Sequence, residues 1–317
     1  MSSELRSKIL IATGEAKKII YGQDNLLDSI VTALVCEGHL LIEGMPGLGK
    51  TLSVSTMAKL CDLSFKRIQF TPDLLPTDLI GTMVYSPRSE EFSTKFGPIF
   101  TQLLLADEIN RAPAKVQAAL LEAMAEKQVT IGENSHRLSS PFVVLATQNP
   151  IEQEGTYQLP EAQLDRFMMK VQVDYPSFEA EKSILGISNH YTAKCDPVLS
   201  TDDLLVLKEV VEAVYVDEKI KDFIVRIVHA TRPGSSFFKK ENQGIIVAGA
   251  SPRAVIWLYK VAKFNAFMDG KDFVSPEHVL KVVPSILGHR ITLSYEALID
   301  QYKAGDVALN LAKSQLI

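Results

Sequence analysis

The chain has 317 residues, of which 46% are hydrophobic and 22% are charged. This length favours two domains over one, and this balance is typical of a folded globular protein and excludes a disordered one. The formal net charge of −5 does not support a general nucleic-acid-binding surface.

The amino terminus and the cysteines together predict a cytoplasmic protein. Residues 1–20 scatter charges among apolar positions and lack the continuous apolar stretch of a signal peptide, and no segment is apolar over the length of a membrane span. Cys36, Cys61 and Cys195 are too few and too widely spaced for a disulfide framework or a metal-binding pair. We therefore expect buried thiols in a reducing compartment and no stable membrane insertion.

Residues 1–175 predict an α/β domain. Helical spacing over residues 3–35, interrupted near Gly22, predicts two helices joined by a turn. Short apolar runs then predict buried strands at residues 39–43, 65–70, 102–106, 142–147 and 168–173. Helical patterns separate several of these runs, notably at residues 49–60 and 115–126. Strands that alternate with helices favour a parallel sheet with helices on both faces.

Residues 176–317 predict an all-helical domain. The sequence Asp-Tyr-Pro-Ser at 174–177 is typical of a domain boundary. Serine, aspartate or proline begins several of the helical segments that follow, as helix starts require. These segments are residues 178–191, 201–214, 217–231, 252–268, 276–288 and 295–302.

A phosphate-binding loop is predicted directly after the first strand. The residues that fit the pattern G-x-x-x-x-G-K-[ST] are Gly44, Met45, Pro46, Gly47, Leu48, Gly49, Lys50 and Thr51. Glycines let consecutive backbone N–H groups curl around phosphate oxygens, and the following helix N-terminus adds positive potential. We expect this loop, with Leu52, to bind ATP, with Lys50 at the β- and γ-phosphates and the Thr51 hydroxyl on Mg²⁺. A chance match in a glycine-rich turn is the alternative, and the strand–loop–helix context disfavours it.

Two acids, Asp107 and Glu108, end another predicted strand. Neighbouring parallel strands end at the same edge of a sheet, so we expect both acids beside the phosphate loop. Asp107 then orients the hydration shell of the Mg²⁺, and Glu108 polarises the water that attacks the γ-phosphate. Strand ends often carry solvated acids, so the pair is informative only because the loop lies upstream. Glu108 favours hydrolysis over nucleotide binding alone.

Four further motifs follow one another along the chain: Asp-Glu-Ile-Asn-Arg-Ala at 107–112, Ala-Thr-Gln-Asn-Pro at 146–150, Leu-Pro-Glu-Ala-Gln-Leu-Asp-Arg-Phe at 159–167 and Gly-Ala-Ser-Pro-Arg-Ala at 249–254. They resemble motifs of the MoxR family of AAA+ ATPases, in the clade with a helix-two insert. The resemblance extends from residue 22 to about residue 290. It implies a P-loop ATPase core followed by a helical lid domain.

The resemblance also implies roles for single residues. Asn149 would be the sensor of the attacking water or γ-phosphate, and Arg166 would be an arginine finger that enters the neighbouring subunit's site. Arg253 would couple the lid to the γ-phosphate, and Gly22 with Gln23 would pack against the adenine. As alternatives, Asn149 before a proline is a turn residue, and either arginine is a structural ion-pair partner. The motif context favours the functional roles.

Two insertions are expected to form hairpins. Residues 71–101 are too long for a simple crossover, and their stretches 84–85 and 92–96 predict one hairpin, similar to the helix-two insert. Residues 127–131 and 136–138 predict a second. In relatives such hairpins touch the client, and surface decoration is the alternative. Residues 233–248 are longer than the family pattern, which predicts either a surface loop or a partner contact through Phe237 and Phe238.

The resemblance implies an enzyme that hydrolyses ATP in a homo-oligomeric ring, expected to be a hexamer. Such a ring would remodel or activate protein clients in a chaperone-like way, in relatives often with a von Willebrand factor A-domain protein and in metal-cofactor insertion or complex maturation. Two alternatives are a nucleic-acid motor of the same clade and a nucleotide-gated scaffold with little turnover. The acidic charge balance and the lack of an appended DNA-binding module count against the motor.

Overall fold

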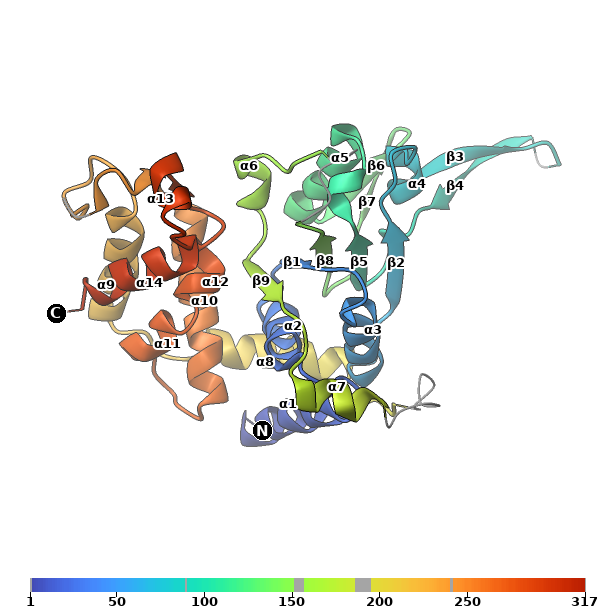
Figure 1. Cartoon of the computed structure of the whole chain (residues 1–317). Helices are drawn as coiled ribbons and strands as arrows, with labels where there is room; N and C mark the ends of the chain where they lie inside the picture. The colour runs from blue at the N-terminus through green and yellow to red at the C-terminus, as the bar shows by residue number, and fades with distance from the viewer. Residues whose placement is uncertain (1, 89, 151–156, 186–194, 240–241, 317) are drawn as a thin grey trace. The chain divides into compact units, whose positions relative to one another are not determined.

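The structure is a computed structural model that describes residues 2–88, 90–150, 157–185, 195–239 and 242–316 (Figure 1). Its internal contacts divide the chain into two compact units. The helical unit comprises Met1–Arg6, Pro160–Lys170 and Leu205–Ile317, and the sheet unit comprises Ser7–Leu159 and Val171–Leu204. The predicted boundary at residues 175 and 176 falls within the second stretch of the sheet unit and stays a prediction. No helix among the described residues combines the length and the apolar character needed to cross a bilayer.

A five-stranded sheet forms the centre of the sheet unit. Its strand order is β2 (Phe65–Gln69), β5 (Leu103–Asp107), β8 (Val143–Gln148), β1 (Leu40–Gly44) and β9 (Met169–Val173). The pairs β2–β5, β5–β8 and β1–β8 are parallel, with Leu105 beside Leu145 and Leu41 beside Ala146. The parallel sheet predicted from the sequence is confirmed, and the carboxyl ends of β1, β5 and β8 therefore lie at one edge.

The position of each strand in the sheet explains its sequence. The central strands β1, β5 and β8 are almost wholly buried, as expected of continuous apolar runs in a parallel sheet. The prediction that residues 65–70 form a buried strand is wrong in one respect, because β2 is the edge strand and exposes Lys66, Arg67 and Gln69. An edge strand has a neighbour on one side only, so polar side chains are tolerated there.

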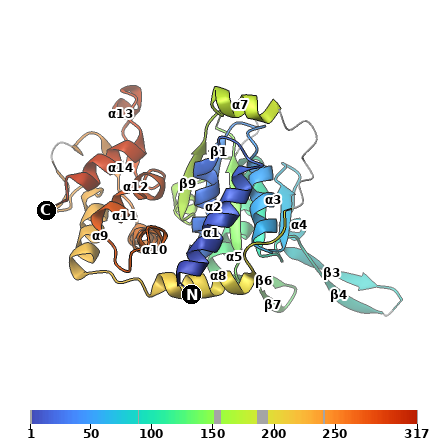
Figure 2. The same cartoon turned by 90° about the horizontal axis from the view of Figure 1, so that it is seen from below.

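Helices pack around this sheet, as Figures 1 and 2 show. The predicted amino-terminal pair is confirmed as α1 (Ser2–Lys17) and α2 (Asp24–Cys36), and the two helices predicted between strands are α3 (Lys50–Leu60) and α5 (Ala114–Glu126). Further elements of this region are α4 (Pro76–Ile80), η1 (Ile109–Arg111) and α7 (Phe178–Leu185). The predicted helix at 178–191 is confirmed as far as Leu185, and its remainder lies outside the described residues.

Both predicted hairpins are present. Strands β3 (Gly81–Ser86) and β4 (Glu91–Phe96) form the first, and β6 (Gln128–Ile131) and β7 (Asn134–Arg137) form the second. The first hairpin exposes a cross-strand aromatic pair, Tyr85 and Phe92, whose ring centroids are 5.2 Å apart.

The helical unit confirms the predicted change to mainly helical structure after the sheet. It differs from the prediction in one divided helix, in two short strands, and in helices at Glu161–Leu164 and Ala304–Lys313 that were not predicted. Its helices are α6 (Glu161–Leu164), α8 (Thr201–Glu212, which begins in the sheet unit), α9 (Glu218–Ala230), α10 (Pro252–Met268), α11 (Pro276–Leu280), α12 (Val283–Leu287), α13 (Tyr295–Ile299) and α14 (Ala304–Lys313). The single helix predicted at 276–288 is two helices, because Pro284 lacks the N–H that a helix interior needs and so opens α12. Two short strands, β10 (Ile246–Ala248) and β11 (Thr292–Leu293), were not predicted.

Predicted helix starts and buried thiols are also found. The side chains of Asp217, Ser251 and Ser294 each accept a backbone N–H at the start of a helix. Cys36 and Cys61 are buried, as predicted, whereas Cys195 is only half-buried. Burial raises the pKa of the Cys61 thiol to about 12, so this group is an inert part of the core.

Candidate functional site

The predicted phosphate loop joins β1 to α3. Gly47 and Gly49 adopt φ angles of +84° and +77°, which L side chains rarely adopt, and Gly49 is the N-cap of α3. A Cβ at either position would meet no atom within 4 Å, so the space above the loop is open. A loop of this conformation at a helix N-terminus presents backbone N–H groups to an anion.

Lys50 lies folded onto this loop. Its ammonium group donates to the carbonyl oxygen of Gly44 and, at 2.9 Å, to that of Met45. Burial lowers the pKa of Lys50, and the nearby carboxylates of Asp107 and Glu108 oppose that shift. The ammonium group is therefore partly desolvated, so it would lose few water molecules when a phosphate binds.

Asp107, at the end of β5, uses both of its carboxylate oxygens. Oδ2 accepts from the Arg67 guanidinium, through Nη2 at 2.6 Å and Nε at 3.1 Å. Oδ1 accepts from the hydroxyl of Thr147 on β8. Arg67 comes from β2, so three neighbouring strands supply this group of side chains.

Glu108 follows directly and adopts a left-handed backbone, with φ of 56°. Its backbone N–H donates to the Thr147 hydroxyl at 2.8 Å, so this one hydroxyl ties both acids to β8. Its carboxylate accepts from the Gln69 amide at 2.7 Å and pairs with Arg111 at 3.0 Å. This conformation is unfavourable for a residue with a side chain, and these contacts hold Glu108 in it.

A cavity of about 360 Å³ brings most of the predicted residues together. Its lining includes these predicted residues: Pro46, Gly47, Gly49, Lys50, Thr51, Leu52, Asp107, Glu108 and Asn149. Asn149 is buried, at 6% exposure, just beyond the end of β8. The remaining lining residues, Arg67, Gln69 and Thr147, were missed from the sequence as site residues. The only signal for Arg67 and Gln69 is their spacing of two, which puts polar side chains on one face near a strand end.

Gly22 and Gln23, predicted at the adenine, do not line this cavity. Gln23 is buried, and its side-chain amide donates to the Asp174 carbonyl at 3.2 Å. Gly22 lies against Pro176 and Ala180, where a Cβ would come within 3.1 Å of both side chains. These residues tie the turn before α2 to the segment after β9, and their contact with adenine stays a prediction.

Arg166 and Arg253 belong to the helical unit, so their contribution to the phosphate cavity also stays a prediction. Arg253 donates to Asp165 at 3.0 Å, and Ser251 and Arg290 bind the same carboxylate. These partners hold the pKa of Asp165 below its usual value against the opposing effect of burial. Asp165, the residue before Arg166, is therefore an ionised carboxylate that three side chains hold in place.

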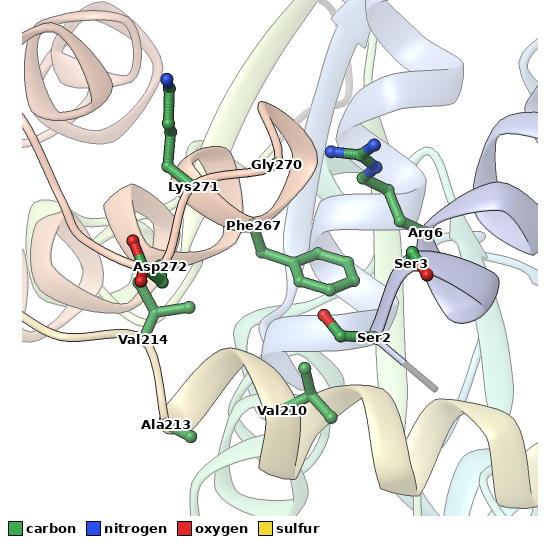
Figure 3. Close-up of a pocket in the computed structure, with 10 residues that line it drawn as sticks. All are labelled: Ser2, Ser3, Arg6, Val210, Ala213, Val214, Phe267, Gly270, Lys271 and Asp272. Carbon is green, nitrogen blue, oxygen red and sulfur yellow. The ribbon is translucent and has the colours of Figure 1, made fainter.

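A second cavity, of about 550 Å³, lies in the helical unit (Figure 3). Its lining residues are Ser2, Ser3, Arg6, Val210, Ala213, Val214, Phe267, Gly270, Lys271 and Asp272. The Arg6 guanidinium lies against Gly270. This lining combines neither a phosphate loop nor an acid pair, so the cavity beside Lys50 is the candidate site.

The oxygen donors at the phosphate loop fit a magnesium ion that is bound together with a nucleotide. Thr51 and Asp107 both line the cavity and offer the hard oxygen ligands that Mg²⁺ prefers. Within the described part of the chain, no cluster of three or more His, Cys, Asp or Glu side chains could hold a metal. Magnesium usually keeps several waters and takes further ligands from substrate phosphates, so one carboxylate and one hydroxyl are enough.

Comparison with known proteins agrees with the fold and with this site. The profile of the ATPase family associated with various cellular activities (AAA) matches residues 39–169, and that of the AAA lid domain matches residues 240–308. Chaperone MoxR1 of Mycobacterium tuberculosis is 47% identical over 90% of this chain and 76% of its own length. The protein YeaC of Bacillus subtilis is 41% identical over 92% of this chain and 89% of its own length.

A solved structure agrees as well. The crystal structure of a candidate ATPase from Cytophaga hutchinsonii superimposes with a TM-score of 0.92 and 44% identity, over 100% of this chain and 96% of the other. A phosphate loop after β1, an acid pair at the same sheet edge at the end of β5 and a helical lid domain together define an ATPase of the AAA+ class. Within that class, the chain belongs to the MoxR family.

Proposed function

We propose that this ATPase works with magnesium in a homo-oligomeric ring, expected to be a hexamer, and remodels protein clients. In its site, the backbone of residues 44–51 and Lys50 bind the phosphates, and Glu108 accepts the proton of the attacking water. Asn149 orients that water or the γ-phosphate. Gly22 and Gln23 contact the adenine, and Arg166 and Arg253 act on the γ-phosphate, the first from the neighbouring subunit.

The observation that supports hydrolysis most strongly is the convergence of Lys50, Asp107 and Glu108 on one cavity. Thr147 fixes the two acids relative to each other through a hydroxyl that is almost fully buried. When bound by Thr51 and Asp107, magnesium would neutralise phosphate charge. The chain's own groups then have separate tasks: Lys50 binds phosphate oxygens, and Glu108 takes a proton.

Replacing the proposed base tests the hydrolytic role. Glu108→Gln should keep nucleotide affinity and lower the turnover rate by about 100-fold or more, because the amide cannot accept the proton. Glu122→Gln, an exposed glutamate on α5, is the matched control and should leave turnover unchanged. Turnover by phosphate release and affinity by a fluorescent ADP analogue are the measurements. Full turnover in the Glu108 variant would refute the assignment.

Mixing two inactive variants tests the ring. Arg166→Ala subunits lack the proposed finger but keep Glu108, whereas Glu108→Gln subunits lack the base but keep Arg166. If Arg166 acts in the neighbouring site, a mixed ring restores intact sites and turnover rises well above either variant alone. Loss of the finger itself should lower turnover by about 10³-fold or more. Mixtures that stay inactive although the subunits co-assemble would refute action between subunits.

The client-remodelling role is supported by the family and by the name of the relative Chaperone MoxR1. Glu108→Gln should trap the ATP-bound ring on its client, so affinity capture followed by mass spectrometry tests the role. A protein client, including a partner with a von Willebrand factor A domain, should be enriched with ATP relative to ADP. Enrichment of nucleic acid in place of protein would instead favour the motor, and no nucleotide-dependent capture would favour the scaffold.

A further inference from the structure

The sequence does not mark Arg67 as part of the site, although its side chain lines the cavity. Arg67 lies on the edge strand β2, and its guanidinium reaches across to Asp107 on β5 with two N–H donors to a single oxygen, Oδ2. A third donation, from Nη2 to Gln69 at 3.1 Å, steadies the guanidinium plane. This arrangement places a permanent positive charge against the carboxylate of Asp107, which is proposed to act at the magnesium ion.

Each oxygen of the Asp107 carboxylate accepts at least one hydrogen bond in this arrangement, and Oδ2 accepts two. Oδ1 accepts from the Thr147 hydroxyl, which is 1% exposed, whereas Oδ2 carries Arg67. The Thr147 bond is buried within the sheet and also engages the backbone of Glu108. The Arg67 side chain is 49% exposed, and so its bond to Asp107 is the one that can open towards solvent.

We propose that Arg67 occupies Oδ2 of Asp107 until magnesium arrives with nucleotide, and that this ion pair competes with the metal for the carboxylate. Arg67 is thus a positioning residue that sets how much magnesium the site needs. The inference rests on the proposed magnesium role of Asp107. Arg67 is then a competing partner for Asp107, so that magnesium does not bind this carboxylate before the phosphates are present.

The strength of the pair sets the size of the expected effect. Half-exposed ion pairs are weak, because solvent screens them and ordering the long side chain is unfavourable. Such a pair can raise the magnesium requirement by about two- to fivefold and no more. A pair of this strength regulates binding without blocking it.

The test measures magnesium binding apart from catalysis. A fluorescent ADP analogue is held at fixed concentration with the full-length protein, and free Mg²⁺ is titrated to find the half-saturating concentration. Arg67→Gln should lower that concentration by about two- to fivefold, and Arg67→Lys should lower it less, because lysine keeps the charge but loses the two-pronged contact. A half-saturating concentration that stays the same or rises in both variants would overturn the proposal.

Lys66→Gln is the matched control. Lys66 is exposed on the same strand, one residue away, and so its side chain leaves the opposite face of β2. It carries the same charge without the contact to Asp107, so its removal should change the magnesium requirement less than Arg67→Gln does. If both substitutions lower the magnesium requirement equally, the positive charge of the strand is responsible, whatever its position. That result would refute a specific role for the Arg67–Asp107 ion pair.

Failure of the proposed magnesium site itself would look different. If the wild-type protein binds the ADP analogue with no dependence on magnesium, the role of Asp107 is wrong. If the wild type depends on magnesium and both Arg67 variants match it, only the inference about Arg67 is wrong. Circular dichroism checks that the variants fold, and Arg67→Lys supplies the answer if Arg67→Gln does not.

Discussion

Glu108 illustrates how single residues are constrained at this site. Its left-handed backbone is unfavourable for a residue with a side chain, by about 1–3 kcal/mol. The Thr147 hydroxyl, the Gln69 amide and the Arg111 guanidinium hold it in that conformation. The sequence reveals the acid pair but neither the strain nor these partners, which come from elements far along the chain or from a local turn.

A second residue-scale feature is His39, which is buried just before β1. Its Nδ1 accepts the Val144 N–H at 3.0 Å, and its Nε2 lies 3.2 Å from the Met124 carbonyl. Nδ1 is therefore unprotonated, Nε2 donates, and the ring is neutral. Burial is the main reason that the pKa of His39 falls to about 4.

This shift predicts a dependence of stability on pH. The folded pKa lies below the ordinary value of 6.5, so the fold favours neutral His39, and its contribution is complete above about pH 6.5. That contribution is lost as the pH falls towards 4, up to about 3 kcal/mol at about 1.4 kcal/mol per unit. Urea unfolding at several pH values, compared with His39→Gln, measures it. Parallel pH profiles for the two proteins would contradict the prediction.

At the scale of elements, the segment that carries Arg166 is clamped by Arg290. Arg290 is 8% exposed and donates to the Asp165 carboxylate and to the carbonyl oxygens of Asp165, Phe167, Met168 and Ile286. Burial lowers the pKa of Arg290 to about 10, against the effect of Asp165. These contacts explain why residues 160–170 belong to the helical unit although they are distant from it in sequence.

Arg290→Met should destabilise the helical unit by about 3–5 kcal/mol, because it leaves a half-buried carboxylate and several carbonyl oxygens without a donor. Trp257, the chain's single tryptophan, lies on α10, so its fluorescence reports unfolding of this unit. Arg253→Met is the control, since its 52% exposed side chain makes one bond to Asp165 and should contribute less than about 1 kcal/mol. If both variants lose the same free energy of unfolding, Arg290 does not hold this segment in the way proposed.

The sequence predicts elements better than it predicts how they associate. The spacing of hydrophobic residues and the residue types at turns locate the five strands, the main helices and both hairpins, because these signals are local. They miss β10 and β11, which are too short to show an alternation of apolar and polar residues. They also miss α14, which begins beyond the last predicted helix. The contact of Arg67 with Asp107 spans 40 positions, and only the strand order makes it possible.

At the scale of the whole molecule, nucleotide binding should appear as added stability. A ligand at 100 times its dissociation constant contributes about 2.7 kcal/mol if it binds only the folded protein. ADP with magnesium should therefore raise the thermal midpoint, and Lys50→Ala should abolish the rise because it removes the ammonium group from the loop. Differential scanning calorimetry with and without ADP measures both. An equal rise in the Lys50 variant would place the nucleotide elsewhere.

The path of the chain between the two units has a mechanical consequence. The backbone passes from one unit to the other after residues 6, 159, 170 and 204. Three of these passages lie inside regular elements, namely α1, β9 and α8. A hydrogen-bonded element resists bending where a flexible tether would not. Motion of one unit relative to the other would therefore have to bend these elements, and cleavage of any single peptide bond cannot separate the two units intact.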